Sequence, residues 1–183
     1  VGGARVAVLP DTPRFDGWLT GREVVDLSRT MADPVPAESA TEEVIAAAGL
    51  AEAAPRKVGG YSRGMLQRLG LAAAVVGDPD VLLLDEPAAA LDPAGRREVL
   101  DLITAIRGKA TVLFSSHILD DVQEVCDRVG ILRRGELVHQ GTLDELLRSR
   151  AVASYTVVVR SDAAETADAV RGAPWVTNAT VEV

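Results

Sequence analysis

Cysteine and aromatic side chains are both scarce in this chain of 183 residues. The single cysteine, Cys126, excludes an internal disulfide and is typical of a protein from a reducing compartment. Because only 3% of the residues are aromatic, alanine, valine and leucine must fill the core that 48% hydrophobic content predicts. Cys126 lies in a segment with a helical pattern, so we interpret it as a small core residue and not as a nucleophile.

Basic residues are in the minority, and long apolar runs are missing. The chain has 19 lysine and arginine residues against 27 aspartate and glutamate residues, a formal net charge of −8. This balance argues against general binding of nucleic acid, which needs a basic surface. No run approaches the ~20 apolar residues of a membrane-spanning helix. The chain opens with Val1-Gly2-Gly3, without a signal peptide or an initiating methionine, which predicts a chain cut from something longer.

An acidic pair directly after an apolar run is the feature around which the chain is organised. Residues 81–84 are Val-Leu-Leu-Leu, and Asp85 and Glu86 follow them. The run predicts a strand buried on both faces of a parallel sheet, and the carboxyl ends of such strands bind ligands in open α/β sheets. Because side chains alternate along a strand, one carboxylate could hold a metal ion while the other handles a water. The alternative is a buried strand whose polar end merely meets solvent.

Capping and turn signals predict how strands and helices alternate along the chain. Thr20-Gly21-Arg22-Glu23 is a capping box, Ser62 is an N-cap, and Asp92-Pro93 is an N-cap followed by proline at the first helical position. Helices are predicted after Thr20, over 41–48, from Ser62 to 76, from Asp92 to Gly108, over 118–127 and after Thr142. The predicted strands are 4–9, 81–84 and 111–115, with a hairpin of 129–132 and 137–140 around Arg134-Gly135. Residues 155–160, 163–171 and 176–183 predict a small β-α-β appendage.

The order and spacing of three of these features resemble the ATP-binding cassette (ABC) ATPase family. A Ser-Arg-Gly turn opens a helix, the acidic strand follows, and a lone histidine ends the next strand. The resemblance covers roughly residues 4–149. The LSGGQ signature is matched by Tyr61-Ser62-Arg63-Gly64-Met65, and the Walker B strand by Val81–Glu86. The D-loop is matched by Ala90-Leu91-Asp92, the switch histidine by His117 and the Q-loop by Leu9-Pro10-Asp11. Residues 141–146 resemble the segment after the last strand of the cassette.

The resemblance implies ATP and Mg²⁺ as ligands and a role for each matched residue. Asp85 would hold Mg²⁺, Glu86 would orient and deprotonate the attacking water, and His117 would contact the γ-phosphate or that water. Ser62 and the backbone amides that follow it lie at a helix N-terminus, which favours anions. The other residues implied in nucleotide binding are Asp11, Arg63, Gly64, Met65 and Asp92. Ser62 as a plain N-cap and His117 as a structural residue stay open as alternatives, and His139 is interpreted as structural.

Three departures from the family pattern stand out. The Walker A loop, GxxxxGK(S/T), is absent: the one Gly-Lys pair, Gly108-Lys109, is followed by alanine. We therefore expect that loop to lie upstream of the first residue. Asp11 stands where the Q-loop usually has glutamine, Arg63 replaces a glycine of the signature, and Met65 replaces its glutamine. These features, with the β-α-β tail, look like the bacterial multidrug and antibiotic-resistance exporter branch.

The sequence therefore predicts an α/β, P-loop NTPase-type fold with a mostly parallel sheet, a helical subdomain at about 14–76 and a small α+β appendage. Residues 1–150 would be the cassette and 151–183 the accessory domain. As the resemblance implies, the subunit would hydrolyse ATP as a head-to-tail dimer with a second cassette, in the cytoplasm, docked on separate transmembrane permease subunits. The alternatives are a soluble ABC ATPase of translation or chromosome maintenance, and a non-catalytic binding module.

Overall fold

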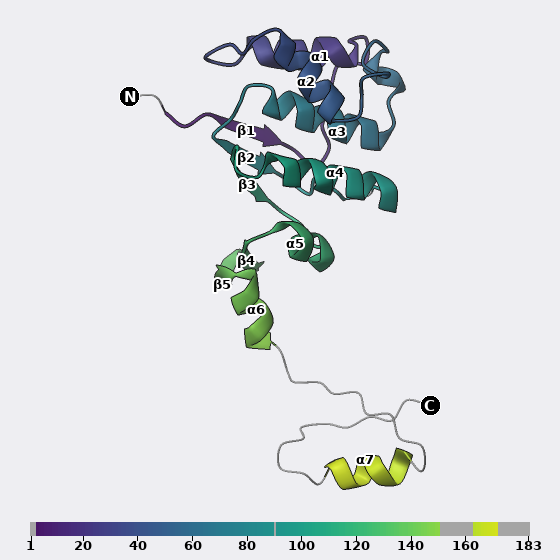
Figure 1. Cartoon of the computed structure of the whole chain (residues 1–183), viewed down its shortest axis with the longest axis vertical. Coiled ribbons are helices and arrows are strands. Elements are labelled where there is room, and N and C mark those ends of the chain that lie inside the picture. Colours follow the sequence, from purple (N-terminus) through teal and green to yellow (C-terminus); the bar gives the residue numbers. More distant parts are fainter. Residues whose placement is uncertain (1–2, 90, 151–162, 172–183) are drawn as a thin grey trace. The chain divides into compact units, whose positions relative to one another are not determined.

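A computed structural model describes residues 3–89, 91–150 and 163–171 of the chain. The chain divides into two compact units, residues 1–143 and residues 144–183 (Figure 1). The first unit contains the sheet and most of the helices, and the second contains α6 (Leu143–Arg150), which begins at the division, and α7 (Ala163–Arg171). A boundary at residue 150, as the sequence predicts, remains a prediction.

The sheet of the first unit is parallel and has the strand order β1-β2-β3. Its strands are β1 (Val6–Leu9), β2 (Val81–Leu84) and β3 (Thr111–Phe114). Their last residues, Leu9, Leu84 and Phe114, are register partners, so the three carboxyl ends are level. The parallel sheet expected from the sequence is confirmed, and the residues that follow the three strands meet at one edge.

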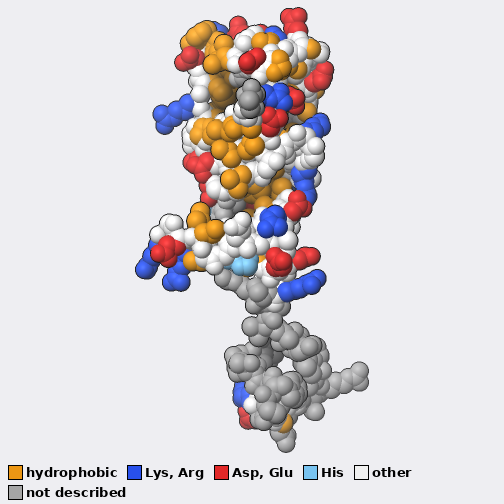
Figure 2. All heavy atoms as spheres, turned by 90° about the vertical axis from the view of Figure 1, so that its left-hand side faces the viewer, with side chains coloured by type: hydrophobic (Ala, Val, Ile, Leu, Met, Phe, Trp, Pro, Cys, Tyr) orange, Lys and Arg blue, Asp and Glu red, His pale blue; other side chains and the backbone are white. Residues whose placement is uncertain are grey.

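Only one face of this sheet is covered in the described part of the chain. Leu82 and Leu84 are buried in a cluster with residues of β1 and of the helices α3 (Arg63–Val75) and α4 (Pro93–Ile106). On the other face, Val6, Val8 and Leu113 are 56%, 63% and 67% exposed. Figure 2 shows hydrophobic side chains gathered on the surface of this unit. The prediction that residues 81–84 form a strand buried on both faces is therefore wrong for the described residues, and β3 is likewise open on this face.

The segment between β1 and β2 has a core of its own. Its helices α1 (Gly21–Thr30) and α2 (Ser39–Ala47) and the short 3-10 turn η1 (Val58–Gly60) pack with α3 around a cluster that includes Val25, Ile45 and Leu69. The capping box of α1 is confirmed: the Glu23 N–H donates to the Thr20 hydroxyl (3.2 Å), and the Thr20 N–H donates to Glu23 Oε2 (2.7 Å). The Thr20 backbone and hydroxyl bonds hold the pKa of Glu23 below its ordinary value.

A buried ion pair ties α4 to α5 (Leu119–Val125). Arg96 Nε donates to Asp121 Oδ1 at 2.6 Å, and the Asp121 side chain is only 3% exposed. One residue further along α4, Arg97 pairs with Glu124 at 3.4 Å on the exposed side. Because α4 follows Asp92 and α5 follows His117, the Arg96–Asp121 pair joins the two helices that begin just after these predicted site residues.

The remaining elements match the predicted hairpin and tail helix. Strands β4 (Arg128–Arg133) and β5 (Glu136–Thr142) pair antiparallel around Arg134 and Gly135, whose φ angles are 52° and 82°. Positive φ at both central residues belongs to the hairpin turn that the sequence predicts. Helix α7 has the predicted bounds, whereas the predicted strands 155–160 and 176–183 lie outside the described residues.

Cys126 directly follows α5, and burial raises the pKa of its thiol. A raised pKa disfavours the reactive thiolate, but Cys126 is only partly buried and belongs to neither core cluster, so its role as a core residue stays a prediction. Within the described ranges, no helix is both long and apolar enough to cross a membrane.

Candidate active site

Asp85 and Glu86 form the acidic end of β2, as predicted. The Asp85 N–H donates to the carbonyl of Leu9 at 2.8 Å, which extends the pairing of β1 and β2 by one residue. Glu86 then turns the chain with φ at 46°, in the left-handed region that residues other than glycine seldom adopt. Because of this turn, the two neighbouring carboxylates reach different partners at the end of β3.

Ser115 joins these two residues, and the sequence interpretation missed it. Its Oγ accepts the Glu86 N–H at 2.8 Å and donates to Asp85 Oδ1 at 2.7 Å. Its own N–H donates to the carbonyl of Leu84 at 2.9 Å. In the sequence, only its position at the end of a predicted strand, two residues before His117, pointed to Ser115. Because serine is common at strand ends, a role for Ser115 could not be inferred without the register of the sheet.

His117 holds the carboxylate of Glu86. Its Nδ1 lies 3.0 Å and 2.9 Å from the two carboxylate oxygens of Glu86. Since an ionised carboxylate only accepts hydrogen bonds, Nδ1 carries the proton and donates it, and Nε2 is the nitrogen left for other partners. The histidine ring is 71% exposed, while Glu86 is mostly covered. The structure thus brings Asp85, Glu86 and His117 together at one edge of the sheet.

Asp11 and Arg63, two of the departures from the family pattern, lie against each other. Arg63 Nη2 is 4.0 Å from Asp11 Oδ1, and both side chains are about half exposed. Asp11 also accepts a hydrogen bond from the Thr12 hydroxyl at 3.3 Å. Asp11 follows β1 and Arg63 begins α3, so this pair links the loop after β1 to the signature turn (residues 61–65).

The other predicted nucleotide-binding residues lie at two helix N-termini. The Ser62 hydroxyl accepts the Met65 N–H (3.2 Å), and Asp92 Oδ1 accepts the Gly95 N–H (3.2 Å), so both N-caps are confirmed. A methyl group added at Gly64 would lie 3.9 Å from Leu91 Cδ2, which places the signature turn against the residue before Asp92. Among the described residues, no hydrogen bond or ion pair joins Ser62 or Asp92 to Glu86.

The donor set suits a hard cation bound together with phosphate. No group of three or more Asp, Glu, His or Cys side chains that could hold a metal is found among the described residues. Mg²⁺ is ordinarily held by one or two carboxylates plus substrate phosphates and water, without a protein cage. Asp85 offers a solvent-exposed carboxylate, and Asp11 lies two residues beyond the end of the neighbouring strand. These residues therefore fit Mg²⁺ that arrives with a nucleotide.

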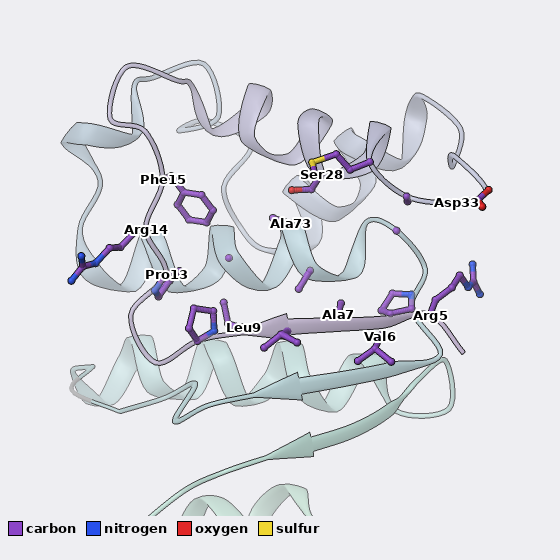
Figure 3. A pocket seen from close by; sticks show the side chains of 18 residues that line it. Arg5, Val6, Ala7, Leu9, Pro13, Arg14, Phe15, Ser28, Asp33 and Ala73 are labelled. Carbon is purple, nitrogen blue, oxygen red and sulfur yellow. The ribbon is translucent and has the colours of Figure 1, made fainter. Parts of the chain in front are cut away.

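A hollow of about 560 Å³ lies elsewhere on the first unit and contains none of the predicted site residues. It is bounded by β1, the loop after it, α1 and α3; Figure 3 shows Arg14, Phe15, Ser28 and Ala73 among the lining side chains. Met31, at the end of α1, also lines it and is 78% exposed. The hollow is therefore separate from the edge of the sheet where Asp85, Glu86 and His117 lie.

Comparison with known proteins identifies the family. A family model described as "ABC transporter" matches residues 2–89. The chain is 40% identical over 157 residues to "Uncharacterized ABC transporter ATP-binding protein YxlF" of Bacillus subtilis, covering 85% of this chain and 53% of that protein. It is 32% identical over 157 residues to "Bacitracin transport ATP-binding protein BcrA" of Enterococcus faecalis, covering 84% and 51%. The chain thus spans about half the length of these curated relatives.

Solved structures confirm the fold predicted from the sequence. "Structure of ATP binding subunit of ABC transporter" has a TM-score of 0.68 and 27% identity, covering 79% of this chain and 62% of that one. "Structure of a bacterial Atm1-family ABC exporter with ATP bound" has a TM-score of 0.68 at 21% identity, covering 84% and 29%, and supports the fold alone.

Proposed function

Because the chain belongs to the ABC transporter family of ATP-binding proteins, we propose that it supplies the catalytic edge of a subunit that hydrolyses ATP to drive export. One observation carries the proposal: Glu86 and His117 are hydrogen-bonded next to Asp85, at the carboxyl end of the central strand. A decayed, purely structural cassette would have no need to hold two carboxylates and an imidazole in this arrangement. The experiment that tests it is ATP hydrolysis by the intact protein and its loss on substitution of Glu86.

Each side chain has a task that its geometry allows. Glu86, aligned by the His117 Nδ1–H, accepts a proton from the water that attacks the terminal phosphate. His117 keeps Nε2 for the phosphate oxygens or the water. Asp85, with Asp11 in reach of the same edge, would hold Mg²⁺, whose chemistry is to neutralise charge on the β- and γ-phosphate oxygens. The remaining parts of the mechanism are positional, as is usual for phosphoryl transfer.

The signature turn serves a second copy of the cassette in this proposal. Ser62 and the first amides of α3 form a helix N-terminus that favours phosphate, and Arg63 adds a positive charge there. Within the described residues, no hydrogen bond or ion pair joins this turn to Glu86. A head-to-tail dimer, in which the turn closes over ATP on the partner, gives it a ligand. ATP would favour the closed dimer because only that form has both halves of the site.

The hollow between β1, α1 and α3 fits a docking surface for a transmembrane partner. It combines apolar side chains, Phe15 and Met31, with the exposed Arg14. Trp18 and Leu27, also between residues 14 and 31, are exposed apolar side chains as well. We assign residues 14–31 to the contact with the membrane subunits, at the cytoplasmic face of the membrane. An antibiotic or another drug-like molecule is the substrate class we favour, because the named relative BcrA is described as a bacitracin transport protein.

We expect the 183 residues alone to show no micromolar site for Mg-ATP. The sequence has no GxxxxGK(S/T) loop, and that loop supplies the backbone cradle and the lysine for the phosphates. Isothermal titration of this chain with Mg-ATP is the measurement, and the intact protein is its control. Tight stoichiometric binding by the 183 residues would mean that the nucleotide lies elsewhere than proposed.

Removal of residues 151–183 from the intact protein should leave the basal ATPase rate within a few-fold of wild type. None of the proposed catalytic residues lies in this segment, which we propose to be an accessory domain for assembly or transport coupling. The steady-state rate is measured beside circular dichroism of both proteins. If hydrolysis were lost while the cassette stayed folded, the tail would have to belong to the active site.

A further inference from the structure

Ser115 uses one hydroxyl group to hold two successive residues of the acidic pair. Its oxygen accepts the Glu86 N–H at 2.8 Å, and its proton goes to Asp85 Oδ1 at 2.7 Å. The backbone of Ser115 is itself fixed, because its N–H donates to the Leu84 carbonyl at 2.9 Å. The hydroxyl therefore connects the end of β3 to both residues that follow β2.

The first of these bonds acts on a backbone that needs support. Glu86 has φ at 46°, a conformation that glycine, asparagine and aspartate adopt more readily than glutamate. This conformation persists only where the surroundings favour it. The Ser115 hydroxyl receives the amide of Glu86 in that conformation, and His117, two residues further on, holds the carboxylate of the same residue.

The second bond engages one carboxylate oxygen of Asp85 and leaves the other available for a ligand. In the part of the chain that the structure describes, Asp85 accepts one side-chain hydrogen bond, at Oδ1. Oδ2 is then the oxygen left for a hard cation or its water shell. A carboxylate that is itself hydrogen-bonded keeps its orientation when the cation binds, which is how partners behind a ligand tune a metal site.

We propose that Ser115 is a positioning residue for ATP hydrolysis: it sets the backbone turn that aims Glu86 and orients Asp85 so that Oδ2 faces the cation. This inference rests on the proposed function, since it assigns to Ser115 the placement of the base and of the metal-holding carboxylate. The neighbouring hydroxyl has another use. Ser116 Oγ accepts the Ile118 N–H at 3.1 Å and does not contact the acidic pair.

The test compares Ser115→Thr with Ser115→Val in the intact protein. These two side chains have nearly the same shape, but only threonine keeps the hydroxyl. Ser115→Val should lower kcat by about 10–100-fold, the usual effect of removing a partner behind a metal-site carboxylate, while Ser115→Thr stays within a few-fold of wild type. Ser116→Val is the matched control and should keep the wild-type kcat.

A second readout needs neither nucleotide nor metal. Hydrogen exchange of the Glu86 amide, followed by NMR in the metal-free protein, should be faster in Ser115→Val than in wild type or Ser115→Thr. Equal kcat for the valine and wild-type proteins would overturn the inference, and so would a threonine variant as slow as the valine one. If the wild-type intact protein hydrolyses no ATP, the proposed function fails instead, and unchanged exchange at Glu86 would separately refute the role of the hydroxyl.

Discussion

Replacing Glu86 by glutamine in the intact protein should lower the rate of ATP hydrolysis by about 10²–10⁴-fold, the usual cost of losing a general base. The amide keeps the size of the side chain and can still accept the hydrogen bond from His117 Nδ1. It cannot take a proton from water. ATP binding should therefore persist, and slow hydrolysis should trap an ATP-bound dimer that size-exclusion chromatography detects.

The matched control is Glu124→Gln, the same chemical change on the exposed side of α5. This variant should hydrolyse ATP at the wild-type rate. Steady-state hydrolysis by Glu86→Gln at the wild-type rate would refute the assignment of the base. Loss of ATP binding in the same variant would instead give Glu86 a role in holding the nucleotide.

The second large effect is expected on stability. Arg96→Met should lower the free energy of unfolding by about 3–5 kcal/mol, because it leaves a buried carboxylate without its partner. Asp121 is the group left behind, and its side chain is 3% exposed in the structure. Methionine retains the apolar stem of the arginine, so the loss is that of the charge and its hydrogen bonds. Urea unfolding of the intact protein is the measurement.

Two comparisons isolate the buried pair. Arg97→Met removes the neighbouring pair with Glu124, whose side chains are both well exposed, and should cost about 1 kcal/mol or less. The double variant Arg96→Met, Asp121→Leu replaces both charges by apolar groups and should recover most of the lost stability. A single Arg96→Met variant as stable as wild type would show that Asp121 is not held by Arg96 in solution.

Local signals in the sequence were sufficient for the ends of the helices and for the hairpin turn. The caps Thr20, Ser62 and Asp92 each bond to a backbone N–H within three residues, so their neighbours in the sequence are also their partners in space. The Arg134-Gly135 turn is equally local. For the same reason, the apolar run 81–84 was enough to place Asp85 and Glu86 at the end of a strand.

Contacts between distant segments could not be predicted in this way. The hydroxyl of Ser115 acts on residues 29 and 30 positions earlier, and its partners depend on the register of β2 and β3. The positive φ at Glu86 could not be predicted because the residue there is not a glycine. The burial of β2 on both faces was also predicted wrongly. An apolar run shows that a strand can be covered, but it does not show which helices cover it or on which face.

The Asp11–Arg63 pair has a consequence for how two ATP sites would communicate. In the proposed head-to-tail dimer, Asp11 belongs to the site on its own chain, while Arg63 belongs to the site completed by that chain's signature turn. The two residues are 4.0 Å apart, so an ionic contact within each chain connects the two sites. If Asp11 held a cation at one site, its contact with Arg63 would weaken, and Arg63 would be available for the phosphates at the other site. Occupation of the first site would then favour occupation of the second, and ATP binding would be cooperative.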